Sequence, residues 1–486
     1  MKMTLKSVSS KRHGALKFMS LVMAATFLIG VPSQSQAQNP TWFDSHSFWR
    51  TKTTDAGTKA AGDDADKLWR QFYYMDDNVT PKPPSANYRA CVALEHKVWV
   101  ASPTQTLITV AGDTYNHEWG ANVPWVPGAE LGLSVDKHVT IYQPSTHKMW
   151  EFWSVSGTYP NISAGNGGYF VNVENSPGIL PSFNAVATGL ALEGGTITKE
   201  DAARIEAASI TDTTNLIPHV LCINIPQVDS SGHWAPATSN DGQGGPNMIK
   251  EGRRFRLPPD VALPTESKLL RAIVIAARDY GIVVRDCTGR GQLIDFLAEQ
   301  PKTGDTIQSA DWTAIMAPKA TWNVVDSFPW TQLRVLTPIQ GWGFVNGSNY
   351  EIETVGLMGT CLKANQATVS GYPCNVWPYY GSPYELWTAQ SQSDGSFELI
   401  PTGAPLLRLA VPGTGTSGSQ VITATDTSGP EQHWSASLNW DGSSTLYPKN
   451  TTTSCALNAT GTAQGSNVNI YPYWGQTSLR WTLVGR

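Results

Sequence analysis

The sequence predicts a chain that is mainly β, with a jelly-roll-like β-sandwich and two covering helices first and a second β domain after it. Three observations predict this architecture. Gly and Pro are frequent, at 43 and 32 of 486 residues, which suits short strands joined by many turns. Apolar and polar residues alternate along several short segments, as they do in strands with one buried face. A tryptophan recurs every 47 residues toward the end of the chain, which indicates an internal repeat.

Length and charge limit the possible functions. A chain of 486 residues is too long for one ordinary core, so we expect two folded domains. The net charge of −5, from 34 basic and 39 acidic residues, favours neither nucleic acid nor an anionic membrane as a partner. The 19 tryptophans are unusual. Indole rings fill cores, but their flat faces also stack on sugar rings, and we expect both uses here.

The first 37 residues are expected to be a signal peptide. Basic residues from Lys2 to Lys17 precede an apolar run from Phe18 to Val31, and small residues then lead to Ala37. The apolar run is shorter than an ordinary membrane span, and no other stretch is long enough. We therefore expect a secreted, extracellular protein with no stable membrane insertion after cleavage. An uncleaved anchor is the alternative, because the basic region is long.

The exported chain is expected to divide at Asn346-Gly-Ser348. A mainly β domain would occupy residues 40–345 and a second domain residues 346–486. No long Ser/Thr/Pro linker separates them, so we expect the two parts to abut.

Alternation predicts the strands of the first domain. Residues 138–142 and 150–155 alternate around a Pro-Ser-Thr-His turn, which is typical of a hairpin. Residues 220–225 and 254–257 are further strand candidates.

Capping residues predict the two helices. Thr198 can cap a helix over 199–208, and Thr265 can cap a second helix whose apolar face includes residues between 269 and 277. Gly281 is placed to end that second helix.

Six cysteines permit disulfides in an oxidising compartment. We expect Cys361 to pair with Cys374, which is close in sequence, and leave the other four open. The absence of CxxC argues against a zinc ribbon or a thioredoxin-like centre. No metal and no cofactor is expected.

The repeat at the end of the chain has three registers. A glycine stands sixteen residues before each recurring tryptophan, and another fixed position lies ten residues before each glycine. The tryptophans are Trp387, Trp434 and Trp481, the glycines are Gly371, Gly418 and Gly465, and the earlier positions hold Cys361, Arg408 and Cys455.

This repeat resembles the ricin B-type β-trefoil lectins, whose three repeats each end in Gln-x-Trp. The endings here are Glu385-Leu-Trp387, Gln432-His-Trp434 and Leu479-Arg-Trp481, so only the middle one keeps the glutamine. The resemblance implies a β-trefoil over residues 346–486 that binds carbohydrate. It also implies that the three indoles fill a shared core and do not touch the ligand.

The lectin resemblance also implies where a sugar would bind. Each repeat of such lectins usually has an Asp after a Cys-Leu pair, a ring six residues beyond the glycine and an Asn three residues further on. The ring positions hold Trp377, Ala424 and Tyr471, the Asp positions hold Lys363, Ala410 and Leu457, and the Asn positions hold Tyr380, Thr427 and Trp474.

The polar pair is therefore missing from all three repeats, which puts a galactose-type site in doubt. Aromatic runs remain in the first and third repeats, so Trp377, Tyr380, Tyr471 and Trp474 are the substrate-binding candidates. Such ring faces suit an extended polysaccharide. The alternative is a trefoil that has lost sugar binding and serves for docking or stability.

The first domain is similar to secreted bacterial proteins of unassigned activity, through stretches at 136–143 and 280–286. That similarity brings no catalytic residues with it, and GxSxG, HExxH and GxxxxGK[ST] are all absent. His219 fits a satisfied buried histidine. Asp241 lies in a loop of small residues, where it fits a functional residue and a turn residue equally well. Loop carbonyls with Asp241 could hold calcium, but no EF-hand spacing surrounds it, and we infer no calcium site from the sequence.

The predicted hairpin holds the best polar cluster. Asp136 and His138 share one strand face, and Glu151 and Trp153 share a face of the partner strand. If the faces coincide, Asp136, His138 and Glu151 are catalytic candidates, and Trp153 is a substrate-binding ring. The alternative is a solvated sheet face with Trp153 packed beneath it.

Two chemistries could use such a groove. A glycoside hydrolase needs a pair of carboxyl groups. A polysaccharide lyase needs a base and an arginine that neutralises a uronate, for which Arg254 and Arg256 are candidates.

The sequence as a whole favours a secreted protein that acts on extracellular polysaccharide or another glycan. In this hypothesis the trefoil binds the glycan, and the first domain is a glycoside hydrolase or polysaccharide lyase. Two alternatives stay open: a non-enzymatic lectin or adhesin in which both domains only bind, and a toxin that the lectin domain delivers.

Overall fold

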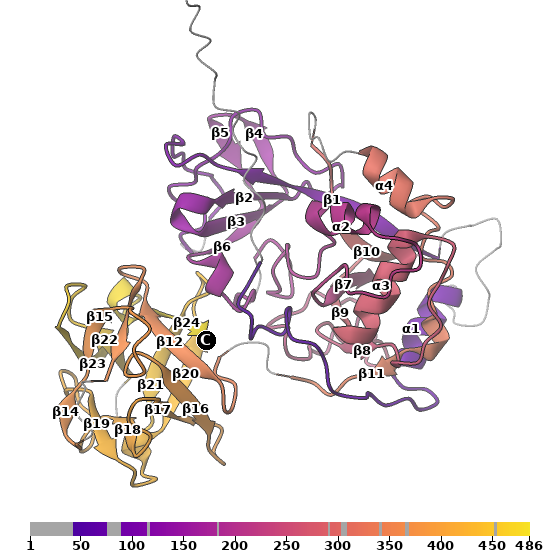
Figure 1. Ribbon diagram of the computed structural model, residues 1–486. Helices are drawn as coiled ribbons and strands as arrows, with labels where there is room; N and C mark the ends of the chain where they lie inside the picture. Colours follow the sequence, from indigo (N-terminus) through magenta and orange to yellow (C-terminus); the bar gives the residue numbers. More distant parts are fainter. Residues whose placement is uncertain are drawn as a thin grey trace, which may run out of the picture. The chain divides into compact units, whose positions relative to one another are not determined.

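The computed structural model describes residues 42–74, 89–113, 117–181, 184–289, 292–302, 309–339, 343–364, 369–451 and 454–486 (Figure 1). All of the described residues belong to one compact unit. The predicted signal peptide lies outside the described residues. Among the helices that the structure describes, none is long and apolar enough to cross a membrane.

The first sheet has nine strands in the order β11-β8-β9-β7-β10-β1-β2-β3-β6. Its longest strand, β1, joins two halves of the sheet, because residues 90–96 pair with β10 and residues 97–100 pair with β2. The strands are β1 (Ala90–Val100), β2 (Val139–Gln143), β3 (Lys148–Trp153), β6 (Asn166–Phe170), β7 (Leu221–Ile225), β8 (Arg254–Arg256), β9 (Ile282–Cys287), β10 (Ile294–Glu299) and β11 (Arg334–Val335). A separate hairpin consists of β4 (Ser156–Thr158) and β5 (Asn161–Ser163).

Four described helices accompany this sheet: α1 (Asp64–Tyr73), α2 (Lys199–Ala207), α3 (Lys268–Asp279) and α4 (Ser309–Met316). The largest core forms where α3, which is buried along most of its length, packs with α1 and α2 against the strands β7 to β10. A second core packs against one face of β2 and β3 and includes Trp119, Trp125 and Phe152.

The prediction of a mainly β fold with few helices is confirmed. The strands of the first part form one mixed sheet where the sequence predicted antiparallel strands in a sandwich. β1 is parallel to β10 and β2, and β7 is parallel to β9. Alternation within a strand shows which face is buried, but it does not show the direction of the neighbouring strand. The sequence pattern therefore could not predict that the sheet contains both parallel and antiparallel pairs.

The predicted helices and hairpin are present. Thr198 caps α2, and Asp201 completes a capping box with it. Ser267, not Thr265, caps α3, since its side chain accepts the N–H of Leu270. Gly281 follows α3 with a φ of +92°, a conformation that favours glycine. The hairpin β2–β3 turns through a 3-10 helix at Pro144–Thr146.

The strands after residue 348 form a β-trefoil. Six of them close a barrel in the order β12-β16-β17-β20-β21-β24, with β12 pairing to both β16 and β24. Hairpins β13–β15, β18–β19 and β22–β23 complete the three repeats. The strands are β12 (Asn349–Thr354), β13 (Thr360–Lys363), β14 (Tyr372–Pro373), β15 (Asn375–Pro378), β16 (Trp387–Ser391), β17 (Phe397–Pro401), β18 (Leu407–Ala410), β19 (Ile422–Thr425), β20 (Trp434–Leu438), β21 (Ser444–Pro448), β22 (Cys455–Ala459), β23 (Ser466–Pro472) and β24 (Trp481–Gly485).

The recurring tryptophans lie in the trefoil core, as the repeat implied. Trp387, Trp434 and Trp481 are fully buried. Each indole N–H donates to a backbone oxygen 2.9 Å away, and the three acceptors are Leu362, Leu409 and Leu457. The recurring glycines all have positive φ, at +97°, +87° and +84°, which explains the glycine in each repeat.

No disulfide joins the six cysteines, all of which lie among the described residues. Cys361 and Cys374 are both buried in the trefoil. The structure therefore does not show the predicted pairing, because Trp377 and not Cys374 lies opposite Cys361 in the β13–β15 hairpin. The domain boundaries at 345 and 346 stay predictions.

Candidate functional site

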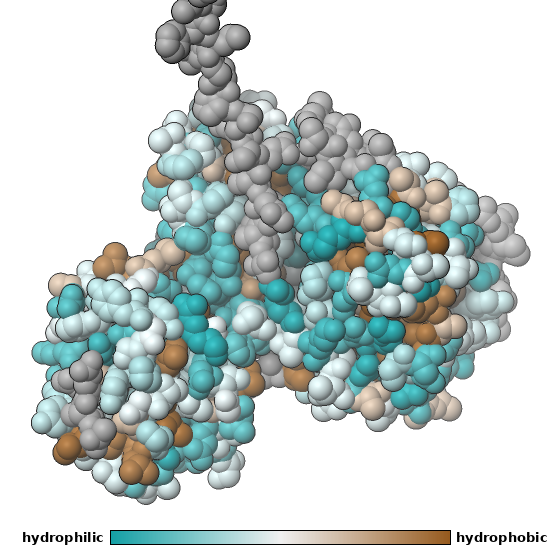
Figure 2. Space-filling view, in the orientation of Figure 1, coloured by the Kyte–Doolittle hydropathy of each residue, from teal (hydrophilic) through white to brown (hydrophobic). Residues whose placement is uncertain are grey.

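The first and third trefoil repeats expose aromatic rings at equivalent positions. Tyr380 follows β15 and is 73% exposed, and Trp474 stands at the same register after β23 and is 79% exposed. Tyr471, at the end of β23, is 45% exposed. On the face shown in Figure 2, hydrophobic side chains are scattered among hydrophilic ones without a continuous apolar patch. The rings of Tyr380, Tyr471 and Trp474 are therefore open to solvent in the first and third repeats.

In each repeat a side-chain oxygen holds the loop at this position, whether or not the loop carries a ring. The oxygen accepts the backbone N–H at the position of Tyr380, Thr427 or Trp474. In the first two repeats it belongs to the residue two before the core tryptophan, and a carboxylate serves as well as an amide because only an acceptor is needed. The pairs are Glu385 Oε2 with Tyr380 at 2.9 Å, Gln432 Oε1 with Thr427 at 2.8 Å and Gln476 Oε1 with Trp474 at 2.7 Å.

Trp377 differs from the other ring candidates because a cation covers one of its faces. The Nζ atom of Lys363 lies 4.6 Å from the Trp377 ring centroid and 3.2 Å from Glu385 Oε1. Lys363 stands where the lectin pattern has an Asp. An ammonium group attracted to both the ring and a carboxylate takes the place of that sugar-binding group. Trp377 therefore offers less ring surface to a ligand than Tyr380 does.

The second repeat has no ring to offer, as its sequence implied. Ala424 lies in β19, and Arg408 in β18 opposite it is buried. Arg408 pairs with Glu398 at 2.8 Å and with Asp426 at 2.7 Å. This ion-pair network occupies the region where a platform would stand.

The hairpin faces in the first sheet coincide, but the predicted catalytic residues do not line an open groove. Thr140 is opposite Glu151, so His138 and Glu151 share a face. Both side chains are buried. Asp136 lies before the strand and accepts a 3.0 Å hydrogen bond from Nε1 of Trp153, which is 39% exposed. The structure therefore buries the side chains of His138 and Glu151. It leaves Trp153 exposed and Asp136 partly exposed at the end of the hairpin.

His138 belongs to a buried charge network that the sequence did not reveal. Glu95 of β1 lies 3.4 Å from Nδ1 of His138 and 2.6 Å from Nη2 of Arg285 in β9. The Arg285 Nη1 group donates to Leu192 O at 2.8 Å. Burial opposes ionisation of Glu95, but Arg285 and the two neighbouring histidines outweigh it and lower its pKa to about 2. Burial lowers the pKa of His138.

Glu151 joins the same region through Glu193. The Glu193 N–H donates to Glu151 Oε1 at 3.0 Å, and Glu193 Oε1 lies 2.8 Å from Nε2 of His96. Burial lowers the pKa of His96, but the carboxylates of Glu193 and Glu95 outweigh this and raise it. Burial, only partly offset by backbone hydrogen bonds, raises the pKa of Glu151 to about 7.

Replacement of Glu151 by glutamine is expected to flatten the pH dependence of stability. A carboxyl group with a pKa raised from 4.5 in the unfolded chain to about 7 in the fold stabilises the fold most below pH 4.5. That contribution is lost as the pH rises through 7, a change of about 2–3 kcal/mol. Urea unfolding of the wild type and Glu151→Gln at pH 5 and pH 8 measures it. Equal changes with pH in both proteins would contradict the prediction.

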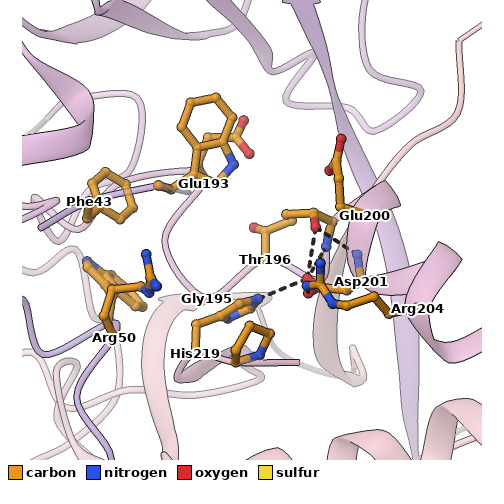
Figure 3. Close-up of a pocket in the computed structure, with 13 residues that line it drawn as sticks. Phe43, Arg50, Glu193, Gly195, Thr196, Glu200, Asp201, Arg204 and His219 are labelled. Carbon is orange, nitrogen blue, oxygen red and sulfur yellow. Dashed lines mark hydrogen bonds and ion pairs between the residues drawn. The ribbon is translucent and has the colours of Figure 1, made fainter. Parts of the chain in front are cut away.

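A cavity of about 130 Å³ lies beside this network (Figure 3). Its aromatic wall comes from Trp42, Phe43 and Trp49. Figure 3 shows Phe43 and Arg50 on one side and the polar residues of α2, Glu200, Asp201 and Arg204, on the other. Glu193 also lines the cavity. Its Oε2 atom is buried and has no hydrogen-bond partner among the described residues.

His219 also lines this cavity, and both of its ring nitrogens face acceptors. Nε2 lies 3.0 Å from Asp201 Oδ2, and Nδ1 lies 2.8 Å from Val220 O. Burial raises the pKa of Asp201, but His219 and Arg204 outweigh burial and lower it. Both ring nitrogens of His219 therefore lie within hydrogen-bond distance of an oxygen, which agrees with the sequence interpretation of a satisfied ring, although the ring is only part-buried. These two contacts hold the ring in the wall of the cavity.

Neither arginine expected to neutralise a uronate lines the cavity. Arg254 and Arg256 are buried, and Arg256 donates to the backbone oxygens of Asp55 and Arg278, both at 2.6 Å. Arg50 and Arg204 are the arginines that line the cavity, and burial lowers the pKa of Arg50. Sequence reasoning missed Arg50 and Glu193 because neither lies in a known motif or in a strand with a clear period.

Comparison with known proteins finds partial likenesses only. No family model and no curated protein matches the chain. A designed three-fold symmetric protein, ThreeFoil, is 25% identical, with a TM-score of 0.27, over 28% of this chain and 97% of its own. The ricin B-like lectin of Macrolepiota procera in complex with lactose is 18% identical, with a TM-score of 0.25, over 29% of this chain and 99% of its own. An exo-β-1,3-galactanase from Clostridium thermocellum is 17% identical, with a TM-score of 0.27, over 32% of this chain and 34% of its own. The trefoil assignment therefore rests on the strand order and the repeated core described above.

Proposed function

We propose that this protein is a secreted glycan-binding protein whose trefoil binds extracellular polysaccharide through the rings of its first and third repeats. The observation that carries the proposal is the exposure of Tyr380 and Trp474 at equivalent positions, each on a loop held by a side-chain acceptor. Exposed rings on positioned loops provide flat apolar faces at low entropic cost, and such faces match the C–H faces of pyranose rings. The basic and apolar segments in residues 1–37 support export.

Two platforms also favour a polymer as the ligand. The lectin-type Asp and Asn are replaced in all three repeats, so the polar contacts that would select one sugar are missing. Separate platforms on one domain can bind separate parts of a long chain, and avidity then replaces tight recognition of a single residue.

Loss of the rings is expected to release the protein from its glycan. In a pull-down on a panel of insoluble polysaccharides, Tyr471→Ala/Trp474→Ala and Trp377→Ala/Tyr380→Ala should each reduce retention about tenfold on the retaining polymer, as expected when two stacking rings are removed. Tyr372→Ala is the matched control, since Tyr372 is a trefoil tyrosine with the same 45% exposure as Tyr471 but lies outside both runs. Unchanged retention in both double variants would reject the platform assignment.

A second candidate function is glycan cleavage in the first part of the chain. The supporting observation is that Glu193 and Arg50 both line the cavity, and that one carboxyl oxygen of Glu193 has no hydrogen-bond partner among the described residues. A polysaccharide lyase needs a base, such as a carboxylate, that removes the proton on the carbon next to the uronate carboxyl group, and an arginine that neutralises that carboxyl group. Under this second hypothesis Glu193 is the catalytic base in place of Asp136, His138 and Glu151. Trp153 is then an exposed residue outside the cavity.

The same polysaccharide panel separates the enzyme from the lectin. Release of unsaturated ends, measured by ultraviolet absorbance, should occur on a uronate polymer and be lost in Glu193→Gln. Reducing ends without unsaturation would favour hydrolysis. Retention without any release on the whole panel would support the non-enzymatic lectin or adhesin.

A further inference from the structure

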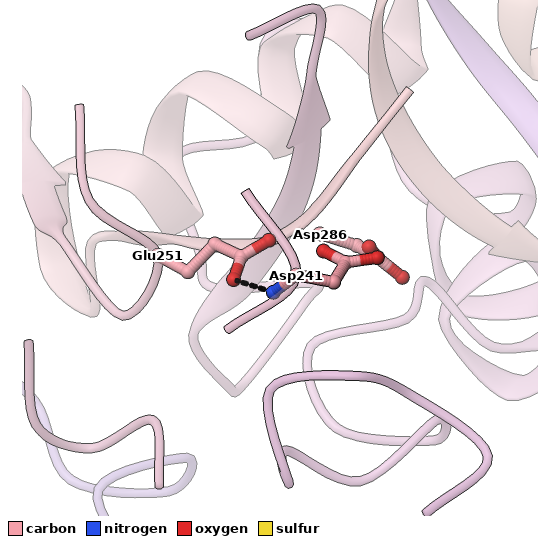
Figure 4. A group of neighbouring side chains, drawn as sticks. All are labelled: Asp241, Glu251 and Asp286. Atoms are coloured by element: carbon pink, nitrogen blue, oxygen red, sulfur yellow. Dashed lines mark hydrogen bonds between the residues drawn. The ribbon is translucent and has the colours of Figure 1, made fainter. Parts of the chain in front are cut away.

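Three carboxyl groups outside the cavity of Glu193 converge at one point (Figure 4). Asp241 lies in the loop between β7 and β8, Glu251 in the turn before β8, and Asp286 in β9. One oxygen from each lies within 4.8 Å of the other two. The sequence marked Asp241 alone, since the other two acids are 10 and 45 residues away from it along the chain.

The backbone holds Glu251 firmly at this point. The Trp234 N–H donates to Glu251 O at 2.7 Å, and the Gly252 N–H donates to Val284 O at 2.8 Å. Gly252 has a φ of +79°, and a Cβ there would lie 1.7 Å from Trp234 O. Only glycine fits such a close approach, so the turn sets the direction of the Glu251 side chain.

Glu251 is fully buried, and one of its carboxyl oxygens lacks a partner. Its Oε2 accepts the Asp241 N–H at 3.3 Å, while Oε1 has no hydrogen bond among the described residues. Figure 4 shows the Glu251 carboxyl group directed toward Asp241 and Asp286. No described Lys, Arg or His forms an ion pair with any of the three acids. A buried acceptor without a donor is costly, and a cation bound at Glu251 Oε1 would remove that cost.

The geometry of the three acids favours a cation. Carboxyl oxygens held within 4.8 Å of one another repel when they are ionised, and a cation bound between them relieves that repulsion.

A cavity beside the cluster supplies room for further ligands. It encloses about 440 Å³ and is lined by Asp241, Gln227, Gln243 and Thr288 among others. These side chains offer amide and hydroxyl oxygens, and the cavity admits water. The Cys287 thiol at its edge is directed to Pro226 O at 3.5 Å. The available ligand set is therefore oxygen, which hard cations prefer over zinc or copper.

We propose that Asp241, Glu251 and Asp286 bind one calcium ion, with water in the adjoining cavity completing its coordination. Calcium takes six to eight oxygen ligands in flexible geometry, whereas magnesium requires a compact octahedron. One ligand lies on an exposed loop and two lie on the sheet side, so the ion fastens the 239–245 loop to β8 and β9. The site is independent of glycan binding by the trefoil.

Calorimetric titration and thermal unfolding of the full chain test the calcium site. After treatment with EDTA, the wild type should bind one Ca²⁺ per chain, and 1 mM CaCl₂ should raise its Tm by about 5 °C. Asp241→Asn, Glu251→Gln and Asp286→Asn should each reduce the Tm rise to about 1 °C or less. Asp260→Asn is the matched control, because Asp260 is an exposed acid just beyond β8 and should keep the full rise.

Three results would overturn the assignment: no Ca²⁺ binding by the wild type, an unchanged Tm rise in Asp241→Asn, or an equal rise with MgCl₂. Asp241 is exposed, so its variant tests the site even if Glu251→Gln fails to fold. Loss of glycan retention in the ring variants leaves the calcium result unaffected, and the two proposals can therefore fail separately.

Discussion

Replacement of Arg285 by methionine is expected to lower the free energy of unfolding by about 3–5 kcal/mol. Arg285 is fully buried, and it is the only described cation other than histidine that pairs with Glu95. Its removal leaves a buried carboxylate beside two histidines, and it takes away one of the two side-chain hydrogen bonds to the Leu192 carbonyl, the other coming from Thr196. Urea unfolding at pH 7, followed by far-ultraviolet circular dichroism, measures the loss.

Removal of both charges should recover much of this stability. The double variant Glu95→Gln/Arg285→Met contains no uncompensated carboxylate, so it should be more stable than Arg285→Met alone by about 2 kcal/mol. The double-mutant cycle separates the ion pair from the packing of the arginine stem. Additive effects of the two substitutions would contradict the network described here.

Replacement of Trp434 by alanine is expected to destabilise the trefoil by about 3–5 kcal/mol. The indole is fully buried in the shared core, and its N–H satisfies Leu409 O. Alanine leaves a large cavity and a buried carbonyl without a donor, and the barrel cannot close over it because all three repeats meet there. Thermal unfolding monitored by circular dichroism gives the loss.

Trp474→Ala is the matched control for this core substitution. Trp474 belongs to the same domain but is 79% exposed, so its removal should change stability by less than about 0.5 kcal/mol. Trp387→Ala and Trp481→Ala should behave like Trp434→Ala because their environments repeat. A small loss in any of the three would contradict the threefold core.

The trefoil shows which features a single sequence predicts well. The 47-residue spacing located three core tryptophans and three left-handed glycines, because each repeat must place the same residue types at the same points of a closed barrel. The hairpin at β2–β3 and the helix cap at Thr198 were predicted for a similar reason, since alternation and caps are local. Thr265 was the wrong cap for α3, as Ser267 competes for that role two residues later.

The candidate sites depend on contacts between distant segments. Glu95, Glu193 and Arg285 come from two strands and a loop, and no period or motif connects them. Asp241, Glu251 and Asp286 meet only because β8 pairs with β9 and a loop lies over that pair. The burial of His138 and Glu151 was invisible for the same reason, since alternation shows which residues share a face but not what covers that face.

The sequence by itself therefore determined the mainly β character, the threefold repeat, the core role of its tryptophans and the aromatic runs of the first and third repeats. These properties are periodic or local, so they can be recognised within short segments or from the spacing of the repeats. Tertiary structure alone decided the mixed sheet, the buried charge network, the cavity with Arg50 and Glu193, and the three converging acids. Those features arise where segments far apart in the chain pack together, and the energies that bring charges into contact there come from the whole fold.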